Sequence, residues 1–240
     1  MTFRQRFDSF RAARIGKRSE FEIRARLGFS LFLFAGIAAA QVADYANSGY
    51  KTEEGRARVA GTLDAHDREQ TQKPRELVKA MGLEKGQSAA DIGTGVGYML
   101  PFLHEAVGPT GKLYAEDIFP DFLAKAKHRV AEKGLANVTF IHGNDRDSQL
   151  PADSVDAVLI LDVYHHFDYP AEMLASVAKG LKKEGRLFIV DFYKKGFRDP
   201  KHIRLDETEL IAEVESHGFQ LVRTGNFTPD RQYMSVFRRK

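Results

Sequence analysis

The sequence from Arg75 to its end alternates short apolar segments with longer segments of helical character. The segment 157–162 contains the uninterrupted run Ala-Val-Leu-Ile-Leu, which is typical of a strand in a parallel sheet that helices cover on both faces. Because strands and helices alternate, we predict one doubly wound α/β domain with a mostly parallel sheet. The expected helices are 75–82, 97–107, 120–133, 170–181 and 207–217, and the expected strands are 88–92, 112–117, 138–142, 157–162, 186–191, 219–226 and 233–238, the last two antiparallel.

A glycine-rich turn follows the first expected strand, in the sequence Asp91-Ile92-Gly93-Thr94-Gly95-Val96-Gly97. Glycines permit positive φ and let a ligand approach the backbone, and open α/β sheets bind ligands at the carboxyl ends of their strands. The spacing departs from the dinucleotide fingerprint, because Tyr98 stands where that fingerprint needs a glycine. The negative charge of Asp91 disfavours a pyrophosphate, which binds at an unscreened helix N-terminus. The same charge favours a ligand that carries an ammonium group and a sulfonium. Alternatively, Asp91 only caps a turn.

Two later strand ends carry further polar side chains. Asp117 ends the second strand and is expected to accept both hydroxyl groups of a ribose, with Ile118 against the adenine. Asp117 is better placed for this role than Glu116. Alternatively, Asp117 is only the N-cap of the next helix. After the third strand, Asn144 and Asp145 are both candidates to bind the adenine amino group, and a plain polar loop is the alternative.

Three segments together resemble the S-adenosylmethionine-binding motifs of class I methyltransferases, in particular the small-molecule group that includes the ubiquinone and menaquinone biosynthesis enzymes. They are 91–97, 114–120 and 150–156, within a resemblance that covers residues 75–195. The resemblance implies a seven-stranded sheet with an antiparallel last strand, and S-adenosyl-L-methionine as the cofactor. It also implies the cofactor-binding residues, with Asp91, Gly93, Thr94, Gly95 and Gly97 on the methionine part, Asp117 on the ribose, and Asn144 or Asp145 on the adenine. The family usually has an aspartate where this chain has Asn144.

The segment 161–167, which follows the fourth strand, is expected to lie beside the transferred methyl group. Displacement at a sulfonium depends mainly on positioning, and a base is needed only for a protonated acceptor. His165 is the first candidate for that base because imidazole titrates near neutrality. His166 is the second candidate, Tyr164 is expected to orient the acceptor, and Asp162 is expected to line the cofactor pocket. Alternatively, the two histidines are structural.

No metal is expected at this site. Asp162 and Asp191 end neighbouring strands and are the alternative ligands for Mg²⁺, but Phe192 stands where catechol-type O-methyltransferases carry a third oxygen ligand. Arg68 is a further candidate for the acceptor site, but a solvated loop charge is the preferred interpretation of it. Topology brings other polar side chains near the acceptor site, namely Asp64, His66, His202 and Arg204.

Residues 1–40 have the three parts of a secretory signal. A basic region precedes the apolar run 27–40, which is short for a helix that spans a bilayer and ends in Ala38-Ala39-Ala40. We therefore predict a leader over 1–40 and an exported or periplasmic protein. An uncleaved membrane anchor that extends to Ala43 and the leader of a cytoplasmic enzyme are the alternatives. Residues 41–72 are predicted to be a linker and an N-terminal cap, and residues 73–240 the cofactor-binding domain.

The basic charge of the chain belongs to the leader. Residues 1–40 hold eight Lys or Arg and three Asp or Glu, a net of +5, whereas the remaining residues have a net of −2. We therefore expect no nucleic-acid partner, because phosphate binding needs clustered basic residues. The absence of cysteine excludes disulfides and thiolate chemistry. The predicted function is methyl transfer to a small-molecule acceptor, and the alternatives are a dinucleotide-binding oxidoreductase and a non-catalytic binding protein.

Overall fold

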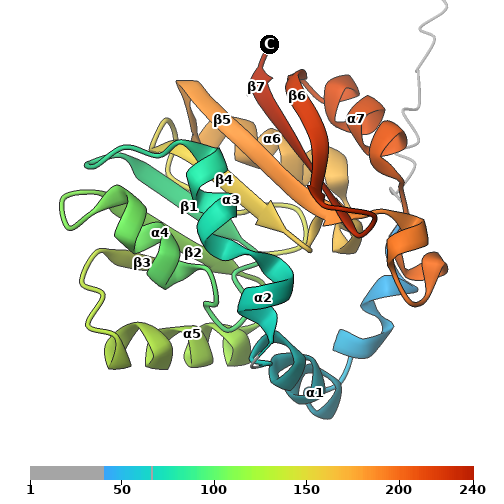
Figure 1. The fold of residues 1–240 in the computed structure, drawn as a ribbon, viewed down its shortest axis with the longest axis horizontal. Helices are drawn as coiled ribbons and strands as arrows, with labels where there is room; N and C mark the ends of the chain where they lie inside the picture. The colour runs from blue at the N-terminus through green and yellow to red at the C-terminus, as the bar shows by residue number, and fades with distance from the viewer. Residues whose placement is uncertain (1–40, 66) are drawn as a thin grey trace, which may run out of the picture. The chain divides into compact units, whose positions relative to one another are not determined.

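The computed structural model describes residues 41–65 and 67–240 (Figure 1). The predicted leader and His66 lie outside these described residues. Within the described part of the chain, no helix combines the length and the apolar character that crossing a membrane requires.

The described residues form a seven-stranded sheet in the order β3-β2-β1-β4-β5-β7-β6. The strands are β1 (Ser88–Ile92), β2 (Lys112–Asp117), β3 (Val138–His142), β4 (Val155–Leu161), β5 (Leu181–Phe192), β6 (Phe219–Thr228) and β7 (Gln232–Arg239). Strands β1 to β5 pair in parallel, and β7 runs antiparallel to both β5 and β6. The predicted mostly parallel sheet with an antiparallel last strand is therefore confirmed.

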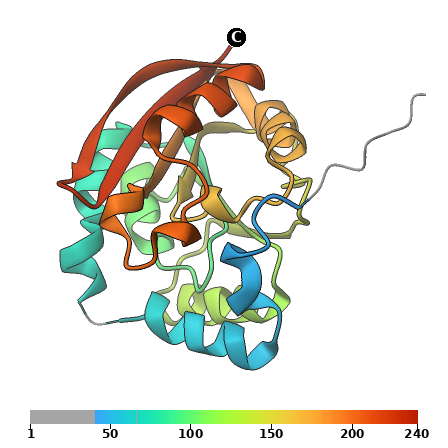
Figure 2. The same ribbon diagram turned by 90° about the vertical axis from the view of Figure 1, so that its right-hand side faces the viewer.

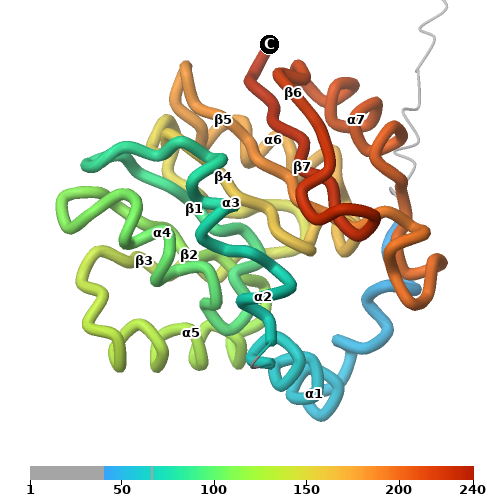
Figure 3. The backbone as a smooth tube through the Cα atoms, in the orientation of Figure 1, coloured from blue at the N-terminus to red at the C-terminus, as the bar shows by residue number. Residues whose placement is uncertain are grey.

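Helices cover both faces of this sheet. One face packs against α3 (Pro74–Met81), α4 (Leu100–Val107) and α5 (Pro120–Glu132), and the other against α6 (Pro170–Gly180) and α7 (Glu207–Ser216). The path of the chain in Figure 3 shows β4 returning to the side of β1 after the chain has passed through β2 and β3. The strand order reverses between β1 and β4, and such a reversal is where open α/β sheets bind ligands.

The sequence sets where most helices begin. Pro74, Pro120 and Pro170 are the first residues of α3, α5 and α6, where the missing N–H removes no intrahelical hydrogen bond. Helix α7 begins with a capping box in which Asp206 and Glu209 bond to each other's backbone. These starts agree with the predicted helices to within one residue, except for α4, which starts at Leu100 rather than 97.

Three strands match the predicted bounds, and three start earlier, β7 by a single residue at Gln232. Strands β4 and β5 begin at Val155 and Leu181 instead of 157 and 186. Val155 pairs with Leu181, and the register then shifts before Ala157 pairs with Arg186. Lys182, Lys183 and Glu184 thus lie in a strand although they are charged, because they occupy an irregular extension at the end of the sheet.

Residues 41–72 contain more helix than a linker would. They form the 3₁₀ turn η1 (Ala46–Tyr50) and the helices α1 (Glu53–Leu63) and α2 (Arg68–Gln72). Arg56 of α1 donates to Asp121 of α5 at 2.8 Å, and α1 lies beside α5 in both ribbon views (Figures 1 and 2). Asp168 accepts hydrogen bonds from the Ala43 N–H and the Asn47 amide. We call residues 41–72 the cap.

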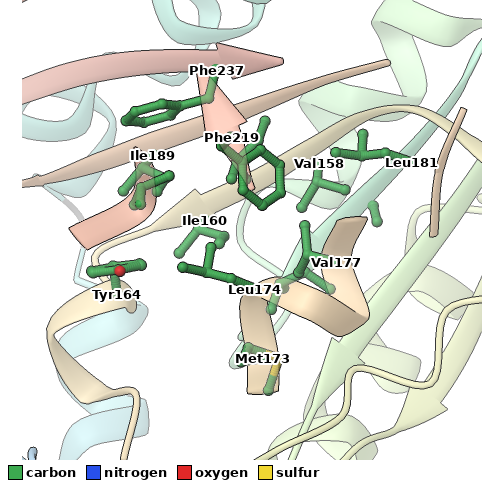
Figure 4. Close-up of a cluster of buried hydrophobic side chains, with 14 of the residues drawn as sticks. Val158, Ile160, Tyr164, Met173, Leu174, Val177, Leu181, Ile189, Phe219 and Phe237 are labelled. Carbon is green, nitrogen blue, oxygen red and sulfur yellow. The ribbon is translucent and has the colours of Figure 1, made fainter. Parts of the chain in front are cut away.

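The largest hydrophobic cluster lies between the sheet and the α6–α7 face (Figure 4). Ile160 and Ile189 project from β4 and β5 towards Leu174 and Val177 of α6, and each of these side chains is fully buried. Burial of apolar side chains contributes about 1.5–3 kcal/mol each. This cluster therefore holds α6 and α7 against the central part of the sheet, where β4 and β5 lie.

We expect Leu174→Ala to lower the free energy of unfolding by about 2–5 kcal/mol, because it removes buried methyl groups and leaves a cavity. Urea denaturation measures the change. Val222→Ala is the matched control, since Val222 is 51% exposed on β6 and its truncation should change stability by less than about 0.5 kcal/mol. Equal effects of the two substitutions would contradict this assignment of the core.

Candidate functional site

A cavity of about 300 Å³ opens at the carboxyl ends of β1, β2 and β4, where the strand order reverses. Its size is at the lower end of small-molecule sites. Strand ends contribute Ile92, Gly93, Glu116, Asp117, Ile118, Leu161 and Asp162, and the cap contributes Gln41, Asp44, Asn47, Tyr50, Lys51, Leu63 and Arg68. The place predicted from the sequence for the site is thus a real cavity, and the cap forms one of its walls.

The glycine turn presents backbone to this cavity. Gly93, Thr94 and Gly95 line it. Gly93 has a φ of +68°, and a Cβ atom there would lie 2.5 Å from Cγ1 of Val163, so a side chain is excluded. Gly97 does not line the cavity. A Cβ at this position would meet Ala126 of α5 at 3.0 Å, so Gly97 serves close packing of the turn against α5, and its contact with the cofactor stays a prediction.

Asp91 lies behind the cavity wall. It is 3% exposed, it is not a lining residue, and it accepts a hydrogen bond from the Thr94 hydroxyl at 2.7 Å. Burial raises the pKa of Asp91 to about 7, although the Thr94 hydrogen bond and the charge of Arg68 oppose this rise. In the absence of a ligand, Asp91 therefore meets the cavity through Thr94, and its direct contact with a ligand stays a prediction.

The end of β2 brings two acidic side chains to the cavity. Asp117 accepts from the Gly95 N–H at 2.8 Å and from the Phe119 N–H at 2.9 Å, and burial raises its pKa to about 6. Glu116, which sequence reasoning placed second, also lines the cavity. Its Oε1 atom is buried without a hydrogen-bond partner among the described residues. Burial, and then the charge of Asp117, raise the pKa of Glu116 well above its ordinary value.

The loop after β3 distinguishes the two adenine candidates. Asp145 lines the cavity. The Oδ1 atom of Asn144 instead accepts from the N–H groups of Arg146 and Asp147, at 2.9 and 3.0 Å. Asn144 therefore shapes the loop, and the prediction that it contacts the cofactor is not supported by its geometry.

Asp162 lines the cavity at the end of β4, as predicted. Its φ of +57° is uncommon for a residue other than glycine. Its Oδ1 atom accepts from the Gln232 amide at 2.5 Å, and Gln232 in turn accepts from Gln72 of the cap at 3.3 Å. Burial, and then the charge of Asp191, raise the pKa of Asp162 to about 6.

Two cap residues in the cavity wall were missed by sequence reasoning. Arg68 is not a solvated charge: its guanidinium lies 4.1 Å from the ring centroid of Tyr98 and donates to the Leu63 carbonyl, and both Asp162 and Asp91 act on it electrostatically. Tyr50 stacks on Phe119 with ring centroids 5.7 Å apart. Burial raises the pKa of Tyr50 to about 12. No local pattern in the cap marks either residue, because only tertiary folding brings the cap to the strand ends.

The two adjacent histidines have different surroundings. His166 lines the cavity, and its Nδ1 atom lies 2.9 Å from Oδ1 of Asn47. Burial, together with the neighbouring His165 and His202, holds the pKa of His166 well below its ordinary value. His165 is not a lining residue. Its Nδ1 atom and its backbone N–H both bond to Asp191, at 2.7 and 3.1 Å, so Asp191 orients the His165 ring.

Tyr164 and Arg204 lie outside the cavity, contrary to the expectation for both. The Tyr164 ring belongs to the hydrophobic cluster (Figure 4), and its hydroxyl donates to Glu213 at 2.7 Å. Arg204 donates to both oxygens of Glu213, at 2.6 and 2.8 Å. Asp64 likewise pairs with Arg129. These pairings contribute to the fold, although the Nε atom of Arg204 is buried without a hydrogen-bond partner among the described residues.

Negative charge dominates the described residues that line the cavity. The acidic lining residues are Asp44, Glu116, Asp117, Asp145, Asp162 and Asp168, and the basic ones are Lys51 and Arg68. Each buried carboxylate is costly unless a positive group compensates it. The cavity therefore favours a cationic or zwitterionic ligand over a polyphosphate.

The buried carboxylates predict a stability that depends on pH. Asp91, Asp117 and Asp162 have raised pKa values in the folded protein, so the folded chain binds more protons than the unfolded chain between about pH 4 and pH 7. Their contribution to stability is thus full below pH 4 and is lost as the pH rises towards 7. At pH 8, Asp91→Asn should raise the free energy of unfolding of the ligand-free protein by about 2 kcal/mol, because it removes a buried charge.

Urea denaturation at pH 8 and pH 4.5 measures this effect, and the gain should shrink strongly at the lower pH. Asp230→Asn is the control, since the Asp230 side chain is 88% exposed. A loss of stability in Asp91→Asn at pH 8, or the same gain at both pH values, would contradict the buried-charge explanation.

Comparison with known proteins supports a family assignment for the core of the chain. Residues 90–189 match the family model described as "Methyltransferase domain". A demethylmenaquinone methyltransferase from Geobacillus sp. (strain WCH70) is 36% identical over 85 residues, which are 35% of this chain and 36% of that protein. A ubiquinone/menaquinone biosynthesis C-methyltransferase from Ectopseudomonas mendocina (strain ymp) is 29% identical over 123 residues, 51% of this chain and 48% of that protein. The matches thus span between about a third and a half of these curated relatives.

A solved structure gives a wider match. The crystal structure of a SAM dependent methyltransferase from Aquifex aeolicus superposes with a TM-score of 0.73 at 25% identity, over 77% of this chain and 98% of that chain. Together with the family match, this likeness confirms both the resemblance that the sequence motifs indicate and the sheet architecture.

Proposed function

We propose that this chain is a class I S-adenosylmethionine-dependent methyltransferase that transfers a methyl group from S-adenosyl-L-methionine to a small-molecule acceptor. The match of residues 90–189 to a methyltransferase domain and the likeness to a solved SAM dependent methyltransferase support this proposal. The observation that carries the proposal is the acidic cavity at the carboxyl ends of β1, β2 and β4, which the glycine turn lines with backbone. A positively charged sulfur nucleoside compensates the buried carboxylates that the cavity contains.

The nucleoside part fits the ends of β2 and β3. Ile118 offers an apolar surface to the adenine, and Asp145 lies in the wall beside it as an acceptor for the amino group. Asp117 and Glu116 are the ribose candidates. Asp117 already holds the glycine turn through Gly95, whereas the unpaired Oε1 atom of Glu116 has hydrogen-bonding capacity for a hydroxyl group. We therefore add Glu116 to the proposed ribose site.

The amino-acid part fits the region between the cap and β4. The methionine end of the cofactor is a zwitterion, and Arg68 and Asp162 provide one positive and one negative group in the same wall. Guanidinium groups bind carboxylates in a fork geometry, so we assign Arg68 to the carboxylate and Asp162 to the ammonium group. Gly93 and Thr94 line the same cavity.

The acceptor side is the more apolar end of the cavity. Bound S-adenosyl-L-methionine supplies a methyl group on a cationic sulfur. Val163, Phe167 and Met173 line this end together with His166, so the acceptor packs against apolar surface and meets one imidazole. We assign the contact with the acceptor to His166 in preference to His165, because His166 is the member of the pair that lines the cavity. Its lowered pKa keeps the ring neutral near pH 7.

The alternative functions are weaker. A dinucleotide-binding oxidoreductase is not favoured, because the family match is to methyltransferases and the cavity is acidic. A non-catalytic binding protein keeps the same cavity, so only activity distinguishes it. Two relatives are named for methylation in quinone biosynthesis, which supports a small-molecule acceptor.

We expect purified protein to bind S-adenosylhomocysteine, and Arg68→Gln to weaken this binding by about 1.5–3 kcal/mol through loss of a charged hydrogen bond. Isothermal titration calorimetry gives both values. Arg58→Gln is the matched control, because Arg58 is exposed on the same α1–α2 segment and should leave affinity unchanged. Tight binding of NADH without binding of S-adenosylhomocysteine would refute the proposed cofactor.

Methyl transfer itself should be visible with labelled cofactor. Incubation of the protein with methyl-labelled S-adenosylmethionine and a fractionated cell extract should place the label in a low-molecular-mass fraction. Asp162→Ala should reduce the rate of labelling by about tenfold or more, because it removes a charged contact worth at least about 1.5 kcal/mol. Label that stays entirely with macromolecules would contradict a small-molecule acceptor, and no transfer to any fraction would favour the non-catalytic alternative.

A further inference from the structure

Three imidazole rings meet beside the cavity, and they come from two distant parts of the sequence. One ring nitrogen each of His165, His166 and His202 lies within 4.8 Å of the others. The ring centroids of His165 and His166 are 4.1 Å apart, and that of His202 lies 5.1 and 5.2 Å from them. Over residues 41–65 and 67–240, this is the one group of three His, Asp or Glu side chains close enough to share an ion. We propose that these histidines bind one divalent transition-metal ion, preferentially Zn²⁺.

The hydrogen bonds of His165 leave the correct nitrogen for a metal. Its Nδ1 atom lies 2.7 Å from Oδ1 of Asp191, and an ionised carboxylate only accepts hydrogen bonds. Nδ1 therefore carries the proton, and Nε2 keeps a free lone pair. Metal-binding histidines usually donate their other ring N–H to a carboxylate or carbonyl group, which fixes the orientation of the ring. The pair of His165 and Asp191 has this arrangement, and the carboxylate supplies negative charge next to a bound cation.

His166 is oriented in the same way by the cap. The Asn47 amide nitrogen donates to the His166 carbonyl at 3.0 Å and to Asp168 at 3.1 Å, so the Oδ1 atom of Asn47 is the acceptor that faces Nδ1 of His166. This leaves Nε2 of His166 as the free nitrogen. Among the described residues, no hydrogen bond uses Nε2 of His165 or of His166.

The third ring is placed by the loop after β5. His202 stacks on Phe197 with ring centroids 4.9 Å apart and an interplanar angle of 10°, and its backbone N–H donates to the Asp199 carbonyl. Among the described residues, its imidazole nitrogens make no hydrogen bond to protein. A buried imidazole N–H needs an acceptor with or without a metal. The acceptors at Nδ1 therefore only identify Nε2 as the free nitrogen of His165 and His166, and the approach of three ring nitrogens to within 4.8 Å of one another is what points to a shared ion.

The donor set selects the class of metal. Imidazole suits Zn²⁺ and neighbouring first-row ions, whereas Mg²⁺ prefers oxygen ligands. In a tetrahedral zinc site with bonds of about 2.0–2.1 Å, ligand nitrogens are about 3.4 Å apart, so the rings need to approach each other by about 1.5 Å at most. Three histidines leave a fourth position open. Because His166 lines the cavity, an oxygen of the bound small molecule is the ligand we assign to it, and this last step rests on the proposed function.

Zn²⁺ binding to the full chain, purified without a polyhistidine tag and freed of metal by EDTA, tests the site. Calorimetry and elemental analysis after dialysis should give one Zn²⁺ per chain. Asp191→Asn removes a hydrogen-bond partner of a metal ligand and should weaken Zn²⁺ binding by about 10–100-fold. His202→Ala removes a metal ligand itself and should therefore weaken Zn²⁺ binding by more than about 100-fold. His128→Ala is the matched control, since the His128 side chain is 75% exposed on α5, and it should bind as the unchanged protein does.

Circular dichroism checks that each variant is folded. If His202→Ala does not fold, the visible spectrum of the Co²⁺-loaded native chain tests the site instead. Intense bands of tetrahedral Co²⁺ would support the three-histidine site, and the weak spectrum of octahedral Co²⁺ would contradict it. Absence of Zn²⁺ uptake, or equal uptake by folded His202→Ala, would overturn the proposal. S-adenosylhomocysteine is titrated into the same preparation without metal, so that failure of the metal site and failure of the proposed cofactor are separate results.

Discussion

Burial of carboxylates at the ends of parallel strands is the constraint on which the site depends. Asp91, Asp117 and Asp162 end or follow β1, β2 and β4, and each has a raised pKa because the sheet and its helices remove water from it. Such burial costs free energy in the absence of a positive partner. The carboxylates lie where the strand order reverses, next to the cavity. A cationic ligand bound in this cavity offsets the free-energy cost of burying them.

The cap completes the electrostatics of the cavity. The core domain supplies the acidic strand ends and the glycine turn, whereas Arg68 and Lys51 of the cap supply the positive charge in the wall. The cap is joined to the core by polar contacts, notably Arg56 with Asp121 and Asn47 with Asp168. Since the same Asn47 also orients His166, the cap connects the proposed cofactor site, the acceptor side and the three-histidine cluster.

Much of the fold was predictable because its signals are local. The apolar strands and the prolines that begin α3, α5 and α6 define element bounds without reference to tertiary structure, and the order of elements then indicates a parallel sheet. The bounds of β5 were not predictable, since the strand begins at Leu181, which pairs with Val155 before a register shift, and the charged residues Lys182 to Glu184 interrupt the hydrophobic pattern. Gly93, Thr94, Gly95, Asp117, Ile118, Asp145 and Asp162 were placed in the cavity wall by the rule that strand ends converge.

The remaining errors concern the direction of side chains and long-range contacts. Tyr164 and His166 are two residues apart, yet the first points into the hydrophobic cluster and the second into the cavity wall. Asn144 and Asp145 are adjacent, and a hydrogen-bonded loop turns only the second towards the cavity. Arg68 and Tyr50 were missed because a polar segment without periodicity does not reveal what it covers. None of these features has a local signal in the sequence.

A crystal structure of the protein with S-adenosylhomocysteine most directly tests whether the acidic strand ends and the cap form one recognition site. We predict that the adenine lies against Ile118, the ribose hydroxyls bond to Glu116 or Asp117, and the carboxylate of the amino-acid end pairs with Arg68. A nucleoside bound outside this cavity, or with its amino-acid end turned away from Arg68 and Asp162, would contradict that recognition.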